Sequence, residues 1–100
     1  AMFTFEDLMF ADKKGFGALI RSANDLDIAT SLKLCSEELT ERIFASMSQR
    51  KREEIEEEVK IMDPKPVAIV LEAHERILDT AKAMIDEEEL MLVRDVSQVL

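Results

Sequence analysis

Apolar residues recur at three- and four-residue spacing along this whole chain, and they rarely alternate singly with polar residues. Such spacing places apolar side chains on one face of an α-helix, whereas strict alternation places them on one face of a strand. The chain has only 2 Gly and 2 Pro, which leaves little material for hairpin turns. The pattern therefore predicts an all-α fold without a β-sheet.

Short polar residues precede the apolar runs and mark the starts of the predicted helices, because their oxygens accept hydrogen bonds from free backbone N–H groups. After an opening turn over residues 4–10, a first helix ends near Ala23. It and the next three helices begin after these caps: Asp12, Asn24, Ser36 and Ser48. A fifth and longest helix begins at Pro66 and runs to about Ile85, and Asp86 begins a last helix or extended tail.

The apolar stripes of these helices define the predicted core. The inward positions, from the first helix to the last, are Phe16, Leu19, Ile20, Leu26, Ala29, Leu32 or Lys33, Leu39, Ile43, Met47, Ile55, Val59, Met62, Val67, Val70, Ala73, Ile77, Ala81, Met84, Leu90, Val93 and Val96. The first three helices are close to ten residues each, too short to be stable alone in water. We therefore expect a compact six-helix array, with the long fifth helix central.

The charge balance narrows the possible partners. The chain has 100 residues, with 13 Lys and Arg against 22 Asp and Glu, which gives a net charge of −9. This length predicts one domain. The acidic balance argues against nucleic acid as a partner, because binding to phosphates needs positive charge. No uncharged stretch approaches the roughly 20 residues that span a bilayer, and no secretory signal pattern opens the chain. We expect a cytoplasmic protein without direct membrane insertion.

Residues that could carry catalysis are few. His74, the only histidine, lies mid-helix beside inward positions, so a place at the core edge is favoured over acid–base chemistry. Cys35, the only cysteine, has no partner for an internal disulfide and is expected to pack as a small apolar residue. Motifs for phosphate loops, metal sites and nucleophilic catalysis do not occur. We expect no enzyme, no cofactor and no metal site.

One charged segment is unusual, because Arg50–Glu58 is basic at its start and acidic in its second half. This order is unfavourable with respect to the helix dipole, because each acidic residue in the first turn stabilises a helix by about 0.3–1 kcal/mol. Local helix stability therefore does not explain it. Helical geometry places the following residues on or beside one face, away from the apolar stripe: Arg50, Glu54, Glu57 and Glu58. We call them the charged ridge.

The charged ridge has three interpretations. It is a solvated helix face, a docking surface on which electrostatics orients a charged partner, or a divalent-cation site. A straight helix lacks the turn that gathers oxygens around calcium, which disfavours the third. The apolar chain end, which contains Met2, Phe3, Phe5, Met9 and Phe10, is a second candidate surface and is expected to pack onto another part of a protein.

Four short motifs occur in order along the chain: Met2-Phe3-Thr4-Phe5-Glu6-Asp7-Leu8, Leu32-Lys33, Ser36-Glu37-Glu38-Leu39 and Met47-Ser48-Gln49-Arg50. A long helix then follows Pro64. Together these segments resemble the C-terminal subdomain of FliG, the rotor protein of the bacterial flagellar motor switch, over roughly residues 2–93. The resemblance implies a fold related to armadillo-like helical folds. It also implies a hinge and first short helix over residues 1–10, and a helical subdomain over residues 11–100.

The resemblance also implies site residues. The Met-Phe-x-Phe hinge motif falls on Met2, Phe3, Thr4 and Phe5. In the family, charged residues on one helix contact the cytoplasmic loop of the stator subunit MotA, and ion flow drives the rotor through that contact. The matching positions are Lys33, Arg50, Glu57 and Glu58, while Pro66 replaces a second arginine and Lys65 is its possible substitute.

The implied partners are MotA, FliM and neighbouring FliG copies. The implied location is the cytoplasmic face of the inner membrane, in the flagellar basal body, with roles in torque generation, direction switching and motility. One alternative is a divergent FliG paralogue or helical adaptor that binds another helical partner through its Phe-rich end. The other is an acidic cation-responsive helical domain, of the kind attached to magnesium transporters.

Overall fold

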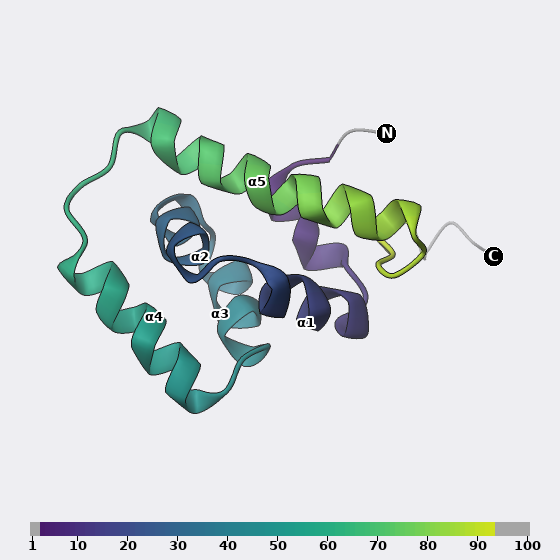
Figure 1. Cartoon of the computed structure of the whole chain (residues 1–100), viewed down its shortest axis with the longest axis horizontal. Coiled ribbons are helices and arrows are strands. Elements are labelled where there is room, and N and C mark those ends of the chain that lie inside the picture. Colours follow the sequence, from purple (N-terminus) through teal and green to yellow (C-terminus); the bar gives the residue numbers. More distant parts are fainter. Residues whose placement is uncertain (1–2, 94–100) are drawn as a thin grey trace.

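The computed structural model describes residues 3–93, whose regular structure is helical (Figure 1). The elements are two short 3-10 helices, η1 and η2, and five α-helices. In chain order they are η1 (Phe5–Phe10), α1 (Lys13–Ser22), α2 (Asp25–Ser31), η2 (Leu32–Leu34), α3 (Glu37–Ala45), α4 (Gln49–Ile61) and α5 (Val67–Asp86). Within residues 3–93 the only β-type pairing is an isolated bridge between Ala11 and Leu92. The predicted all-α fold is confirmed.

The predicted helix starts are also confirmed. The side chains of Asp12, Asn24, Ser36 and Ser48 each accept a hydrogen bond from a backbone N–H two or three residues further on, at 2.8 to 3.1 Å. These bonds satisfy donors that the first helical turn leaves free. Pro66 is the N-cap of α5 and not its first residue, so α5 begins one position later than expected.

The long helix α5 lies along one side of the molecule and packs against α2, α1 and η1 (Figure 1). Helix α2 lies between α5 and α4 and contacts both, while α3 packs on η1. The shorter elements thus assemble beside α5, with α4 attached chiefly through α2. No helix of the described region is both long and apolar enough to cross a membrane.

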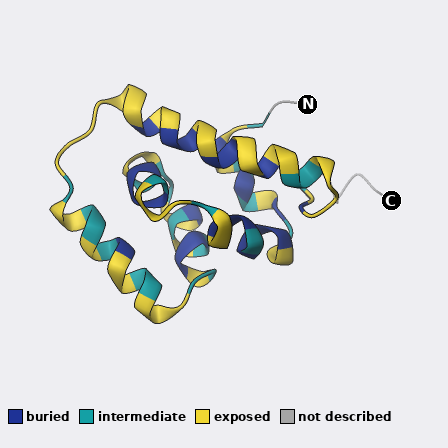
Figure 2. Cartoon of the chain, viewed as in Figure 1, coloured by how far each residue is buried: buried dark blue, intermediate teal, exposed yellow. Residues whose placement is uncertain are grey.

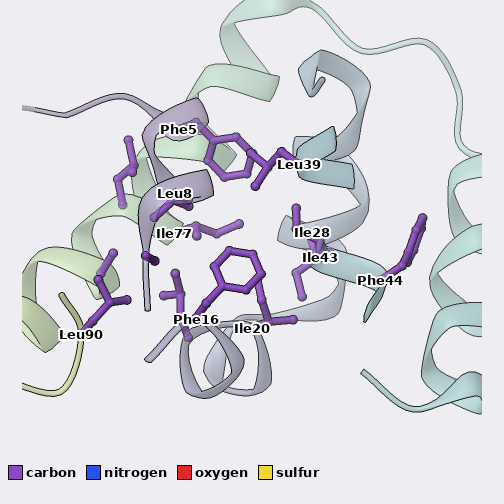
Figure 3. Close-up of a cluster of buried hydrophobic side chains, with 14 of the residues drawn as sticks. Phe5, Leu8, Phe16, Ile20, Ile28, Leu39, Ile43, Phe44, Ile77 and Leu90 are labelled. Carbon is purple, nitrogen blue, oxygen red and sulfur yellow. The ribbon is translucent and has the colours of Figure 1, made fainter. Parts of the chain in front are cut away.

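The core forms where η1, α1, α2, α3 and α5 meet. In Figure 3, Leu8, Phe16, Ile28 and Ile77 point toward one another from four of these elements. Phe16 and Leu8 are each only 1% exposed, and Phe16 is the largest fully buried side chain of the described residues. Phe44 points away from this centre, toward α4. The core therefore joins the chain end η1 to the body of the domain.

Three inward predictions are wrong. Leu26 is 54% exposed and Val67 is 61% exposed, although both fall on predicted apolar stripes. Helix α2 is packed on two sides, so residues 28–31 are all buried in succession and no single stripe describes it. Val67 is the first residue of α5, whose burial begins only at Val70, after the exposed residues 67–69. The third error is Val93, which lies in an exposed segment after α5.

Of the two alternatives predicted after Asp86, the extended tail and not the last helix is observed in the described residues. Asp86 ends α5 instead of starting a new helix, and the chain turns at Glu88, which has a left-handed φ of 61°. The N–H of Glu89 donates to the carbonyl of Met84 at 2.7 Å, which closes the helix end as a Schellman motif does. Leu90 is buried as expected, and Val96 lies outside the described residues.

Asp12 joins this C-terminal segment to α1. Its carboxylate accepts from the backbone N–H groups of Gly15 at 2.9 Å and Met91 at 2.8 Å. The bonds from Gly15 and Met91 lower the pKa of Asp12. Gly15 is required by the close approach of the two segments, because a Cβ there would lie 2.8 Å from the carbonyl oxygen of Glu89. One carboxylate thus caps a helix and fastens a distant segment.

Candidate interaction site

The charged ridge lies on the outer face of α4, as the helical geometry predicted. Arg50 Nε lies 3.4 Å from Glu54 Oε1, and the two side chains are 90% and 54% exposed. Glu57 is exposed, while Glu58 is half-buried and lines a shallow pocket against the start of α2. Figure 2 shows one buried position along α4, which is Ile55. Arg50, Glu54 and Glu57 are therefore open to a partner, while Glu58 lies at the half-buried edge of the ridge.

The reversed charge order of α4 has a tertiary cause that the sequence analysis missed. Lys51 Nζ lies 2.6 Å from Asp25 Oδ1 on α2. Arg52 Nη2 lies 3.5 Å from Glu41 Oε1 on α3, and the guanidinium carbon of Arg52 lies 4.9 Å from the centroid of the Phe44 ring. Two of the three basic residues at the start of α4 therefore attach it to the body of the domain. Arg50 alone of the three points into solvent.

The two lysines implied by the resemblance lie on other elements. Lys33 is exposed on η2, and Lys65 is exposed in the segment between α4 and α5. Within residues 3–93, neither lysine forms an ion pair with the acidic residues of α4. The structure thus brings together Arg50, Glu57 and Glu58 on one helix and leaves Lys33 and Lys65 outside it.

The hinge residues that the structure describes are all attached to the domain, and Phe5 is the most deeply buried of them. Phe5 is 5% exposed, and its ring stacks on His74 with centroids 3.9 Å apart and planes 2° from parallel. The backbone N–H of Thr4 donates to the Asp7 carboxylate at 2.8 Å, and Phe3 is half-buried. Met2 lies outside the described residues. Phe5 therefore belongs to the packed body of the domain.

Polar groups add to this attachment of η1. Arg42 donates to the carbonyl oxygens of Leu8 at 2.7 Å and Met9 at 3.0 Å, and also to that of Ala11. Its guanidinium lies over the Phe16 ring at 4.3 Å, and partial burial lowers the pKa of Arg42. The sequence analysis missed this role of Arg42, because its acceptors lie 31 to 34 residues away and no local pattern indicates the contact. The arginine thus binds carbonyl groups at the end of η1, and that of Leu8 also accepts from the N–H of Ala11.

His74 and Cys35, the two residues considered for catalysis, both take part in the packing of the domain. His74 is buried, and its Nε2 lies 2.9 Å from the carbonyl oxygen of Ser31, so this nitrogen donates. Cys35 packs partly buried against the core, and burial raises the pKa of its thiol. Within residues 3–93, no group of three or more potential metal-ligating side chains comes together.

Fold and surface together define an all-helical domain that presents a charged face on one helix. A family model described as "FliG C-terminal domain" matches residues 1–92. The chain belongs to this family.

Similar proteins agree with this assignment. The flagellar motor switch protein FliG of Bacillus subtilis is 36% identical over 93 residues, which cover 93% of this chain and 28% of that protein. The FliG of Thermotoga maritima is 31% identical over 93 residues, which likewise cover 93% of this chain and 28% of that protein. The chain thus spans little more than a quarter of these relatives. A crystal structure of FliG from H. pylori has a TM-score of 0.86 at 24% identity, over 90% of this chain and 40% of that one, and shows the same fold.

Proposed function

We propose that this domain is the part of a flagellar motor switch that faces the stator and receives torque from it. The observation that carries the proposal is the exposed charged ridge on a helix whose own attachments use other side chains. Lys51 and Arg52 hold α4 to the body of the domain, while Arg50 and Glu57 stay open to solvent. A partner can therefore engage the ridge without competing with the contacts that keep α4 in place.

The partner proposed for the ridge is the cytoplasmic loop of the stator protein MotA. Exposed ion pairs contribute about 0 to 1 kcal/mol each. A contact made of several such pairs orients the partner and still dissociates quickly, which a motor needs at every step. Lys33 and Lys65 are proposed to extend the contact as flanking positive charges. In this role the domain lies at the cytoplasmic face of the inner membrane, beside FliM and neighbouring FliG copies. The proposed role is mechanical and involves no catalysis.

The hinge is proposed to move the ridge when the motor reverses direction. Phe5 is fixed by His74, and the rest of η1 is held by Arg42. Because the Thr4 N–H is bonded to the Asp7 carboxylate and Phe3 packs against the core, the proposed rotation lies at or before Phe3. A hinge placed there would move residues 5–93 as one rigid body.

The experiment is a motility assay in cells whose only copy of the whole protein carries Arg50→Glu, Glu57→Lys and Glu58→Lys. The proposal predicts cells that build filaments but rotate them slowly or not at all. A matched variant with Lys14→Glu and Glu87→Lys, at exposed positions away from α4, is predicted to swim normally. Normal swimming of the ridge variant, with filament counts unchanged in both strains, would remove the proposed role of the ridge.

A further inference from the structure

A groove between α1 and the end of α3 contains positive charge that the fold does not use. Lys13, Gly17 and Arg21 are spaced by four residues, so they form one row along α1. This row lines a hollow of about 470 Å³ together with Ala45 and Ser46 at the end of α3. Both basic side chains are exposed, and neither forms an ion pair among the described residues. We call this hollow the α1 groove.

Arg21 differs from the other arginines that the structure describes. Each of those binds an acceptor of its own chain, since Arg42 binds backbone carbonyl groups while Arg50, Arg52 and Arg76 bind carboxylates. The chain has 22 Asp and Glu, yet Arg21 has no hydrogen-bond acceptor among the described residues. A guanidinium is always charged and presents its N–H donors as a planar fork that fits a carboxylate. Arg21 is therefore available to a carboxylate from outside.

Gly17 lets the Arg21 side chain lie along the wall of the groove. A Cβ added at Gly17 would lie 3.2 Å from Arg21 Nη1, and the three nearest atoms that it would meet all belong to Arg21. Glycine inside a helix is less stabilising than alanine. At Gly15 the close backbone of Glu89 explains the glycine, but no such contact exists at Gly17. The effect of Gly17 is instead to give the guanidinium its place in the groove.

A second hollow, of about 510 Å³, adjoins the α1 groove and is partly apolar. Ile20 and Met47 line it, and it shares Arg21 and the end of α3 with the α1 groove. Lys13 lies eight residues before Arg21, which is about 12 Å along the helix axis. A single small anion cannot reach both charges and the apolar surface, whereas a stretch of polypeptide can. Lys14 contributes less, because it also lines another hollow with Glu88 and Glu89.

We propose that the α1 groove binds an acidic segment of another protein, in which an apolar residue stands beside Asp or Glu. One carboxylate of the segment accepts from the Arg21 guanidinium, and another lies near Lys13. The apolar residue enters the hollow lined by Ile20 and Met47. Charge complementarity favours this partner, because these bases have no acidic partner in a chain of net charge −9. The contact uses no residue of the charged ridge and does not depend on the role proposed for it.

An NMR titration of the chain with the blocked peptide Glu-Glu-Leu-Glu-Glu, in physiological salt, tests this inference. The amide signals of Gly17 and Ser46 are expected to shift and to saturate, with a dissociation constant of about 0.1–1 mM. Arg21→Glu is expected to weaken binding about tenfold, and Arg21→Lys about threefold because the planar fork is lost. A peptide with serine in place of leucine is expected to bind more weakly. Lys60→Glu, at an exposed position on α4, is the matched control and should leave binding unchanged.

Gly17→Ala separates this role from a purely structural one. The added methyl group displaces the guanidinium, so binding is expected to weaken about threefold. The melting temperature should not fall, because alanine favours a helix more than glycine does. Unchanged binding by this variant would contradict the place assigned to the Arg21 side chain.

Peptide binding that leaves the Gly17 and Ser46 signals unmoved would overturn the inference, as would equal binding by Arg21→Glu and the original chain. Inorganic phosphate that binds as tightly as the peptide would also overturn it, because the groove would then hold a small anion. Shifts of the same signals with the concentration of the chain alone would assign the groove to a second copy instead. Circular dichroism of every variant checks that the helical fold is kept.

Discussion

The short helix η1 and the long helix α4 are attached to the body of the domain in opposite ways. η1 has six residues, yet Phe5 and Leu8 are buried and Arg42 binds its carbonyl groups. α4 has 13 residues but only one buried side chain, Ile55, with ion pairs at its first turn. The length of a helix therefore does not set how firmly it is held. Buried side chains and shared backbone groups do.

This difference matches the roles proposed for the two regions. A segment next to a hinge has to move with the body of the domain, and η1 is packed into the same core as α1, α2 and α5. A helix that presents charges has to keep most of its surface in solvent. Salt and denaturant are therefore expected to act on α4 first, since exposed ion pairs hold part of it.

The largest effect is expected from Arg42→Ala. The variant leaves the carbonyl groups of Leu8, Met9 and Ala11 without a charged donor, so the free energy of unfolding should fall by about 3 kcal/mol. Arg52→Ala, the matched change at the attachment of α4, should cost no more than about 1 kcal/mol because its carboxylate partners are exposed. Urea denaturation followed by circular dichroism measures both. Equal losses would contradict the contrast between the two attachments.

Ile55→Ala is expected to lower the free energy of unfolding by about 2 kcal/mol, near the low end for a buried isoleucine. The loss is limited because α4 can separate locally while the remaining core stays packed. Ile61→Ala, at a 68% exposed position on the same helix, should change stability by less than about 0.5 kcal/mol. Denaturant titration compares the two. A loss as small as that of the surface variant would show that Ile55 does not anchor α4.

Asp12→Ala is expected to cost about 1 kcal/mol at neutral pH and progressively less in acid. The pKa of Asp12 is lowered from its ordinary value of 3.8, so the folded state favours the carboxylate. Its contribution is complete above pH 3.8 and is lost as the pH falls through the lower native pKa. Urea midpoints from about pH 7 to about pH 3 follow this change.

The matched control for this titration is Asn24→Ala, because the Asn24 cap does not titrate. Its cost, also about 1 kcal/mol, should stay constant across the same range. Parallel pH profiles for the two variants would contradict the assigned role of the Asp12 carboxylate.

The smallest effect is a gain in stability. Glu88 has a left-handed φ of 61° at the end of α5, a conformation that glycine adopts without steric cost. Glu88→Gly is therefore expected to stabilise the domain by about 0.5–1 kcal/mol, measured as a higher melting temperature. Glu87→Gly is the neighbouring control, with φ −88°, and should give no gain. A lower melting temperature for Glu88→Gly would contradict the strain assigned to this residue.

The local part of this structure could be predicted from the sequence. The caps at Asp12, Asn24, Ser36 and Ser48 depend on residues two or three positions away, and all four are observed. The outer face of α4 also followed from helical spacing, because Ile55 fixes the buried side.

The tertiary part could not be predicted in this way. Lys51 was assigned to a reversed charge pattern, but its partner Asp25 lies on another helix. The contacts of Arg42 with η1 span 31 to 34 residues and leave no periodic trace. Leu26 was misassigned because α2 is buried on two sides. Each of these failures concerns which helices become neighbours, which spacing along one helix does not encode.

Native-state hydrogen exchange tests most directly whether α4 is held less firmly than η1. The amide of Ile55 reports on α4, while those of Ala11 and Asp12, bonded to Leu8 and Met91, report on the end of η1 and its junction. The attachments predict that Ile55 exchanges by a local opening with a free energy below that of Ala11 and Asp12, and with little dependence on denaturant. Opening of all three amides at the same free energy, with the denaturant dependence of global unfolding, would contradict it.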